Sequence, residues 1–314
     1  MIRSLGELVA RGTRSAVHAY GRDAVIKVPD RATPEHWILA EARYAAAVRA
    51  AGAPAPRLLD IEQVGGRSSS VWEWVRGPSM WQEVLAAPAR AAAYGRLLAE
   101  LQLELFALVP PMALPLQRDR LINKVRRSAL AIDPGLTRNV GLLPAAVGPL
   151  RLCHGDLHPG NVILSEDGPV VIDWFDASRG DAAADVARSS LLLRGTPLHL
   201  PGATTSTLAA LAGAYEHRIR AELDVSDEQL ECWDAVEVVA QMGERPSEAA
   251  LLEAWEGRGH PVYQLVVPHA GRISTAARSS AKTPGVAATT RSSFSGQGSS
   301  VMAPASAAMS APAA

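Results

Sequence analysis

Two apolar runs near the N-terminus, Ala24–Val28 and Ser70–Val75, show the patterning of β-strands. Between them, Thr33-Pro34 predicts a helix start, with Thr33 as the N-cap and Pro34 in the first turn. The helix is expected to stop at Gly52, because glycine commonly follows the last helical turn. The N-terminal part of the chain is therefore predicted to contain short strands and one helix.

The pattern changes beyond these strands. From Pro88 the chain becomes Ala- and Leu-rich, which predicts helices. A β segment interrupts the helices at 151–173, and they resume from about Asp181. The predicted fold class is α+β: a small unit of strands with one helix, then a larger, mainly helical unit that contains one hairpin. The break between the units is expected near Gly77-Pro78.

The hairpin is the most informative part of the sequence. Two β-branched runs flank an Asp-Gly turn within residues 165–169, which predicts antiparallel pairing. If Leu164 pairs with Val170, Asn161 falls opposite Asp173, and a slip of one residue would still leave both at adjacent strand ends. Amide and carboxylate oxygens are ligands that suit Mg²⁺ rather than zinc.

Asp156 lies five residues before Asn161, in a loop with Gly155 and Gly160. An Asp-x₄-Asn spacing followed by a hairpin that ends in Asp173 is the layout of a kinase catalytic centre. In such a centre the first Asp faces the acceptor hydroxyl, and the other two residues hold the metal ions that bridge the ATP phosphates. Each element alone is a weak signal, whereas the combination is specific.

The string His154-Gly-Asp-Leu-His-Pro-Gly-Asn161, followed by Val171-Ile-Asp-Trp174, resembles the signature of the aminoglycoside phosphotransferases and of related choline-kinase-like small-molecule kinases. The resemblance extends from residue 1 to about 268. It implies a protein-kinase-like two-lobe fold, Asp156 as the catalytic base, and Asn161 and Asp173 as magnesium ligands. His158 is interpreted as a hydrogen-bonding brace of the loop. Gly180-Asp181 and Asp185 also resemble the family, although Ala182 stands where proline is common.

On this resemblance, residues 1–77 form an N-lobe that positions the nucleotide, with an inter-lobe hinge at 72–78. Residues 78–269 form a C-lobe with the catalytic loop, the metal hairpin and the acceptor site. Residues 270–314 are expected to be a disordered tail, because 34 of these 45 residues are Ala, Ser, Thr, Gly or Pro and none is acidic.

A kinase centre also needs a cation for the ATP phosphates and an acid that holds this cation. Lys27 lies in an apolar β run. On the following helix, Glu41 shares the apolar face with Tyr44 and Val48, where an unpaired carboxylate would be costly. We therefore predict a pair between Lys27 and Glu41, which matches the Lys–Glu pair of the family. The alternative is that both side chains reach the surface.

Two further segments are assigned to the nucleotide, ATP or GTP. Gly12 and Ser15 lie in the candidate phosphate-covering loop, which has one glycine rather than G-x-G-x-x-G. Residues 72–77 resemble the hinge, whose backbone near Glu73 and Val75 would bind the base. Core packing is the alternative for the tryptophans of this segment.

Acidic residues outnumber arginines eight to two in residues 216–237. Ser226 and Gln229 predict a capping box that opens a helix. The apolar face of this helix leaves Glu231 and Asp234 on the surface. These two would attract a polycationic acceptor if the helix lines the cleft. The alternative is a solvated helix face.

The predicted function is transfer of the ATP γ-phosphate to a hydroxyl of a small cationic molecule. An aminoglycoside-type antibiotic is the preferred acceptor. Choline-like amines, sugars and macrolides are alternative acceptors. Two other classes remain open. The spacing His154-x-Asp156-x-His158 could hold the metal ion of a hydrolase, and a kinase-like module could bind a nucleotide without turnover.

The composition of the chain limits which classes of binding partner are expected. Lys plus Arg number 31 against 32 Asp plus Glu, so the net charge of −1 argues against a strongly basic nucleic-acid binder. Two cysteines cannot form a disulfide framework, no apolar run reaches the roughly 18 residues of a membrane span, and no secretory signal is evident. We expect a cytoplasmic protein without membrane or nucleic-acid partners, and no protein partner is indicated.

Overall fold

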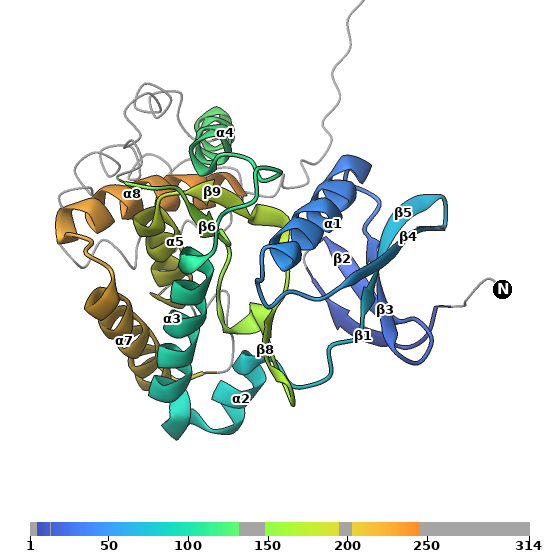
Figure 1. Ribbon diagram of the computed structural model, residues 1–314, viewed down its shortest axis with the longest axis horizontal. Helices are drawn as coiled ribbons and strands as arrows, with labels where there is room; N and C mark the ends of the chain where they lie inside the picture. The colour runs from blue at the N-terminus through green and yellow to red at the C-terminus, as the bar shows by residue number, and fades with distance from the viewer. Residues whose placement is uncertain (1–4, 13, 132–147, 195–202, 245–314) are drawn as a thin grey trace, which may run out of the picture.

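The computed structural model describes residues 5–12, 14–131, 148–194 and 203–244. They form a smaller β-rich lobe and a larger helical lobe that lie side by side (Figure 1). Residues 245–269 of the predicted C-lobe and the predicted tail, 270–314, lie outside the described residues. Within the described ranges, no helix is both long and apolar enough to span a bilayer.

The smaller lobe is a five-stranded antiparallel sheet in the order β1-β2-β3-β5-β4, accompanied by helix α1 (Glu35–Ala50). Its strands are β1 (Leu8–Arg11), β2 (Ser15–Ala19), β3 (Ala24–Pro29), β4 (Leu58–Val64) and β5 (Arg67–Glu73). The two predicted strands correspond to β3 and β5. Ile26 and Val71, on these neighbouring strands, are buried in a small core of the sheet.

Helix α1 begins differently from the prediction. Its N-cap is Pro34, and Thr33 does not cap it, because the Thr33 Oγ1 donates instead to the carbonyl oxygen of Arg14 at 3.0 Å. The hydroxyl thus bonds to the β1–β2 connection, which lies 19 residues earlier in the sequence. Local preferences for helix starts cannot predict such a long-range contact. The other end agrees with the prediction, since Gly52 follows the helix with a positive φ of 99°.

The larger lobe is built mainly from helices, of which α3 packs against α7, and α8 packs against α4 and α5. These helices are α2 (Met80–Ala86), α3 (Ala91–Ala107), α4 (Gln117–Ala131), α5 (Ala182–Arg194), α7 (Thr205–Glu222) and α8 (Asp227–Glu244). Helix α2 was not predicted, although Ser79 and Gln82 form a capping box at its start.

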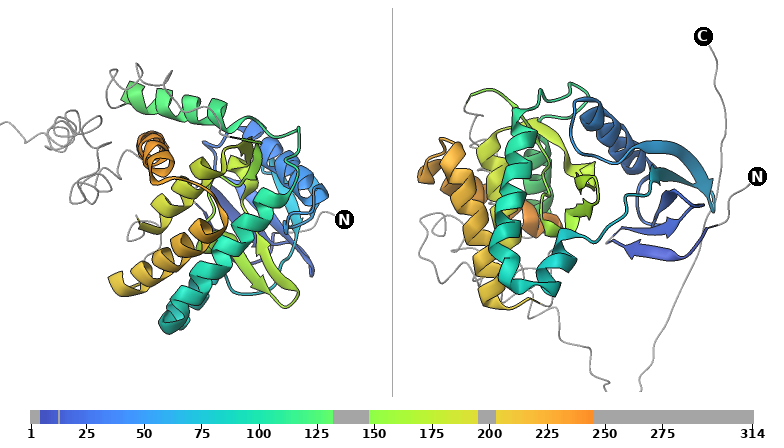
Figure 2. Two further views of the ribbon diagram at one scale, coloured as in Figure 1. Left: turned by 60° about the vertical axis from the view of Figure 1, so that its left-hand side comes forward. Right: turned by 60° about the horizontal axis from the view of Figure 1, so that its bottom comes forward.

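Two antiparallel ribbons complete the larger lobe. The first pairs β6 (Arg151–Cys153) with β9 (Ser178–Gly180), a strand that the sequence did not predict. The second is the predicted hairpin, β7 (Val162–Ser165) and β8 (Gly168–Val171), which lies on the side of the larger lobe that faces the smaller lobe (Figure 1; Figure 2, right). Val171 joins it to the smaller lobe, because its N–H donates to the Pro54 carbonyl oxygen at 2.7 Å.

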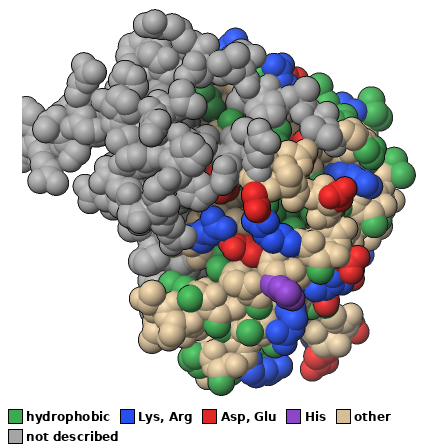
Figure 3. All heavy atoms as spheres, turned by 90° about the vertical axis from the view of Figure 1, so that its left-hand side faces the viewer, with side chains coloured by type: hydrophobic (Ala, Val, Ile, Leu, Met, Phe, Trp, Pro, Cys, Tyr) green, Lys and Arg blue, Asp and Glu red, His purple; other side chains and the backbone are tan. Residues whose placement is uncertain are grey.

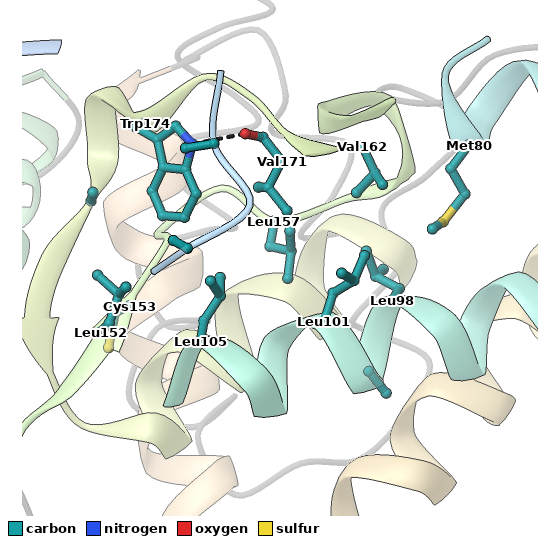
Figure 4. Close-up of a cluster of buried hydrophobic side chains, with 14 of the residues drawn as sticks. Met80, Leu98, Leu101, Leu105, Leu152, Cys153, Leu157, Val162, Val171 and Trp174 are labelled. Carbon is teal, nitrogen blue, oxygen red and sulfur yellow. Dashed lines mark hydrogen bonds between the residues drawn. The ribbon is translucent and has the colours of Figure 1, made fainter. Parts of the chain in front are cut away.

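The main apolar core lies directly beneath the loop and hairpin that carry the candidate chemistry (Figure 4). Leu157 follows Asp156 in sequence and Trp174 follows Asp173, and both apolar side chains are at most 1% exposed. The Trp174 Nε1 donates to the Val171 carbonyl oxygen at 2.8 Å. Burial of each neighbour therefore fixes the backbone next to a candidate acidic residue, and truncation of such buried side chains costs about 2–5 kcal/mol.

Candidate active site

The hairpin register differs by one residue from the prediction. Leu164 pairs with Pro169 rather than with Val170. The ribbon closes through a two-residue turn between Ser165 and Gly168, which is shorter than the loop inferred from the sequence. Two-residue turns suit the twist of paired strands, so turn geometry decided the register.

As a consequence, Asn161 lies opposite Ile172, whose N–H donates to the Asn161 carbonyl oxygen at 2.9 Å. Asp173 follows with φ 64° and is the only described residue other than glycine with a positive φ. This backbone conformation is costly for a residue with a side chain and is typical of functional sites. Asn161 and Asp173 still line the same cavity.

Lys27 on β3 joins two carboxylates. Its Nζ lies 2.6 Å from Glu41 Oε1 and 3.3 Å from Asp173 Oδ1. Burial alone would lower the pKa of Lys27, but the carboxylates of Asp173 and Glu41 outweigh it and raise the pKa above its ordinary value. Burial also raises the pKa of Glu41, and this effect is larger than the opposite effect of the positive charge of Lys27. The Lys27 ammonium group thus contacts two carboxylates at once, one from each lobe.

Glu41 is only 7% exposed, so the alternative that its carboxylate reaches the surface is wrong. The Glu41 carboxylate comes from the inner face of α1, and the sheet supplies Lys27 opposite to it. The alternation of β3 and the helical period of α1 thus bring the two charges together across the smaller lobe.

A cavity of about 350 Å³ is lined by residues of both lobes. Its volume falls within the range of small-molecule sites. Its walls include Val17, Val25, Trp72 and Ile163, which give it an apolar part. It is also lined by the eight residues that the sequence assigned to nucleotide and metal ions: Gly12, Ser15, Lys27, Glu41, Glu73, Val75, Asn161 and Asp173.

Asp156 lines an adjoining, smaller cavity of about 110 Å³. The two cavities share five lining residues, among them Lys27 and Asp173. The Asp156 side chain is 28% exposed, so a ligand can reach its carboxylate. The four polar groups that the sequence placed in a kinase-like centre therefore surround one continuous region of the structure.

Arg188 of α5 holds the Asp156 carboxylate, a contact that the sequence analysis missed. The Arg188 Nη2 lies 3.0 Å from Asp156 Oδ1, and its Nε donates to the Gly155 carbonyl oxygen at 3.2 Å. Burial alone would raise the pKa of Asp156, but the Arg188 guanidinium and then His158 outweigh it and lower the pKa. The carboxylate is therefore ionised at neutral pH and fixed in orientation.

Asp185, also on α5, holds the backbone of the same loop. Its buried carboxylate accepts the N–H of His154 at 3.1 Å and the N–H of Gly155 at 2.7 Å. Gly155 has φ 78°, and an added Cβ would lie 2.6 Å from the Asp176 carbonyl oxygen, so only glycine fits. His158 acts as the predicted brace, because its Nδ1 accepts the Gly160 N–H at 3.1 Å.

Asn161 and Asp173 offer oxygen ligands for a divalent cation. The Asn161 Nδ2 donates to the Asp156 carbonyl oxygen at 2.9 Å, which leaves the amide Oδ1 for a cation. Asp173 adds a carboxylate that is 46% exposed. An amide oxygen and a carboxylate fit Mg²⁺, which is bound in nucleotide sites by one or two such protein groups together with phosphate oxygens and water.

The metal-hydrolase alternative finds no support. Among the described residues, no group of three or more His, Cys, Asp and Glu side chains could hold a metal ion. His154 is fully buried, and its Nδ1 accepts the N–H of Asp156 at 3.2 Å. The other ring nitrogen lies 3.1 Å from the Ile172 carbonyl oxygen, so both nitrogens are already engaged.

The surface position predicted for Asp234 is wrong. Asp234 is 7% exposed, lies 3.7 Å from an Arg194 guanidinium nitrogen, and lines neither of the two cavities. The helical pattern placed it on the surface, outside the apolar face, but Arg194 of the neighbouring helix α5 lies against it. The side chain of Glu231 lies outside the described part of the structure.

Other acids of the 216–237 segment are also paired with arginine. Glu216 lies 2.6 Å from Arg194, and Glu222 lies 2.8 Å from Arg218. On the face of the larger lobe drawn in Figure 3, acidic and basic side chains are interspersed. The segment is therefore less available to a polycation than its composition suggested.

A second group that the sequence analysis missed surrounds Asp176, three residues after Asp173. The Asp176 Oδ1 lies 2.5 Å from Arg120 and 3.1 Å from Lys124, both on α4. Burial alone would raise the pKa of Asp176, but Lys124 and Arg120 hold it well below its usual range. The i, i+4 spacing of the two cations was visible in the sequence, but their shared partner depends on tertiary packing.

Comparisons with known proteins agree with this geometry. The chain matches the sequence profile of the Phosphotransferase enzyme family over residues 9–224. A comparison with curated protein sequences gave no match.

Solved structures of aminoglycoside phosphotransferases share the fold. An aminoglycoside-3′-phosphotransferase of type VIII has 22% sequence identity and a TM-score of 0.53, with 76% of this chain and 93% of that chain covered. A thermostable mutant of the type (4)-Ia enzyme has 16% identity and a TM-score of 0.53, with 89% and 97% covered. An enzyme from Streptomyces rimosus has 21% identity and a TM-score of 0.50, with 74% and 92% covered.

These likenesses show the two-lobe, kinase-like fold, with a β-rich N-terminal part and a helical C-terminal part. The profile match spans more than half of the chain and includes Lys27, the loop with Asp156, and the hairpin. The protein therefore belongs to the phosphotransferase enzyme family.

Proposed function

We propose that this phosphotransferase moves the γ-phosphate of ATP or GTP to a hydroxyl of a small molecule, with Mg²⁺ as the metal ion. One observation carries the proposal: Lys27, Asp156, Asn161 and Asp173 line two adjoining cavities that share five residues. Phosphoryl transfer needs positioning and charge neutralisation rather than a covalent enzyme intermediate, and these four groups provide both.

Each side chain has a distinct role in this mechanism. Asp156, ionised and oriented by Arg188, hydrogen-bonds the acceptor hydroxyl and takes its proton. Lys27, held between Glu41 and Asp173, binds the nucleotide phosphates. Asn161 and Asp173 would hold Mg²⁺, which when bound neutralises phosphate charge. The larger cavity, with Glu73 and Val75 in its wall, accommodates the base and sugar.

We propose an aminoglycoside-type antibiotic as the first acceptor to test. The sequence motif supports this choice, as does the similarity in fold to aminoglycoside phosphotransferases. One of these relatives was solved with ADP and streptomycin. The paired acids of the 216–237 segment add little support. Choline-like amines, sugars and macrolides therefore belong in the same test.

The test is a coupled ADP-release screen with ATP and GTP over these four acceptor classes, with and without Mg²⁺. The expected result is Mg²⁺-dependent nucleoside diphosphate release that one acceptor class stimulates and that Asp156→Asn abolishes. The matched control is Asp119→Asn, which changes an exposed acid on α4. Tight nucleotide binding without turnover on any acceptor would favour a binding module instead.

A further inference from the structure

The turn between β1 and β2 carries Arg14 next to the candidate phosphate site. The turn is closed by the Gly12 N–H, which donates to the Ser15 carbonyl oxygen at 2.9 Å. The Arg14 carbonyl oxygen accepts two hydrogen bonds from the β3–α1 connection, from the Asp30 N–H at 2.8 Å and from the Thr33 Oγ1 at 3.0 Å. The backbone at Arg14 is therefore anchored to the body of the lobe.

The Arg14 side chain extends from this anchor across the seam between the lobes. Its guanidinium carbon lies 5.2 Å from the Trp37 ring centroid and 5.5 Å from the Phe175 ring centroid. Trp37 belongs to α1, whereas Phe175 lies two residues after Asp173. Cation–π contacts at exposed sites are worth only about 0.5–1 kcal/mol each, so an anionic ligand can draw the guanidinium away from the rings.

Arg14 lines the smaller cavity together with Lys27, Asp156 and Asp173. Lys27 is already neutralised by two carboxylates. By contrast, no carboxylate of the described residues lies within 4 Å of the Arg14 guanidinium. Arg14 thus adds a positive charge to the cavity that Asp156 and Asp173 also line. Its described side-chain contacts are with aromatic rings, and the charge of Glu41 acts on it without a close ion pair.

We propose that Arg14 is a catalytic residue that binds the transferring phosphoryl group. A planar guanidinium can donate two parallel hydrogen bonds to two phosphoryl oxygens, which a lysine cannot do. The candidate phosphate-covering loop between β1 and β2 has one glycine, so it is less suited to bind the phosphates through backbone N–H groups alone. The charge of Arg14 would supply the missing stabilisation of the phosphates. This inference rests on the proposed phosphotransferase activity.

In the proposed step, the bond between the γ-phosphorus and the β–γ bridging oxygen breaks, and its electron pair leaves with the nucleoside diphosphate. A new bond forms between the acceptor oxygen and the same phosphorus, and the hydroxyl proton goes to Asp156. Arg14 stays protonated throughout and stabilises the negative charge on the phosphoryl oxygens.

The experiment compares Arg14→Gln and Arg14→Lys with the wild type, and uses Arg22→Gln as the matched control. Arg22 is an exposed arginine of the same lobe, in the β2–β3 turn, and lines neither cavity. The readouts are kcat, the KM for ATP, the Kd for Mg²⁺-ADP, and the Kd for Mg²⁺-ADP with aluminium fluoride, which imitates the transferring phosphoryl group.

For Arg14→Gln we expect kcat to fall about 10²–10³-fold, as for other lost transition-state donors. The KM for ATP and the Kd for Mg²⁺-ADP should stay within about threefold, because the interaction is made in the transition state. The affinity for the aluminium fluoride complex should fall in parallel with kcat, Arg14→Lys should recover part of the loss, and Arg22→Gln should behave as wild type.

Two results would overturn this inference alone: a wild-type kcat in Arg14→Gln, or a loss of Mg²⁺-ADP affinity as large as the loss of kcat. The second result would make Arg14 a nucleotide-binding residue without a role in transfer. Failure of the proposed function gives a different pattern, since the wild type itself would then show neither Mg²⁺-dependent turnover nor binding of Mg²⁺-ADP.

Discussion

Replacement of Asp185 by alanine tests whether α5 holds the catalytic loop. The substitution removes the carboxylate that accepts the N–H groups of His154 and Gly155. Asp185 is fully buried, so water does not readily replace it. The Gln102 Nε2 also donates to this carboxylate at 2.9 Å, but it keeps a contact of 3.3 Å with the Ser189 hydroxyl. Each unsatisfied buried donor costs about 1–3 kcal/mol, so the two backbone donors should lower the free energy of unfolding by at least about 2–6 kcal/mol. That loss is a large share of the roughly 5–15 kcal/mol typical of folded proteins.

The assay is urea unfolding followed by circular dichroism, together with kcat in the ADP-release assay. Asp119→Ala is the matched control because it removes an exposed aspartate from α4. We expect Asp185→Ala to lose both stability and turnover, whereas the control stays within about 0.5 kcal/mol of wild type. An Asp185→Ala protein with wild-type stability and full turnover would refute the assigned role of these hydrogen bonds.

Three further predictions concern the same site. Lys27→Ala should raise the KM for ATP and lower kcat/KM by at least about 10²-fold, because the phosphates lose their cation; unchanged kinetics would exclude Lys27. Gly155→Ala should destabilise the fold by about 1–3 kcal/mol through backbone strain, measured by urea unfolding, and a neutral effect would contradict the positive φ. Asp176 has a lowered folded-state pKa, so the stability it provides is present above its unfolded-state pKa of about 4 and is lost as the pH falls below it. Asp176→Asn should therefore lose less stability than the wild type as the pH falls below about 4, measured by acid unfolding. An equal loss in the two proteins would contradict this role of Asp176.

Local sequence patterns predicted the parts of the site that lie close together in the chain. The spacing of Asp156, Asn161 and Asp173 follows from one loop and one hairpin. The pair of Lys27 and Glu41 follows from strand alternation and helical period, because a carboxylate on an apolar helix face needs a cation. These inferences needed only short-range geometry.

The errors and omissions depend on contacts between distant segments. The hairpin register was set by a tighter turn than the sequence suggested. Arg188 reaches Asp156 from α5, and Arg14 reaches Phe175 from the other lobe. Asp234 was expected at the surface because helical periodicity does not show that Arg194 covers it. Tertiary partners of charged side chains therefore had to come from the structure.

The central claim is that Asn161 and Asp173 bind one divalent ion beside the nucleotide phosphates. The most direct measurement is the affinity for Mn²⁺, by electron paramagnetic resonance, with a non-hydrolysable ATP analogue at saturation. The account predicts that Asp173→Ala and Asn161→Ala each weaken Mn²⁺ binding at least about tenfold, while Asp119→Ala leaves it unchanged. Wild-type Mn²⁺ affinity in both site variants would contradict the claim.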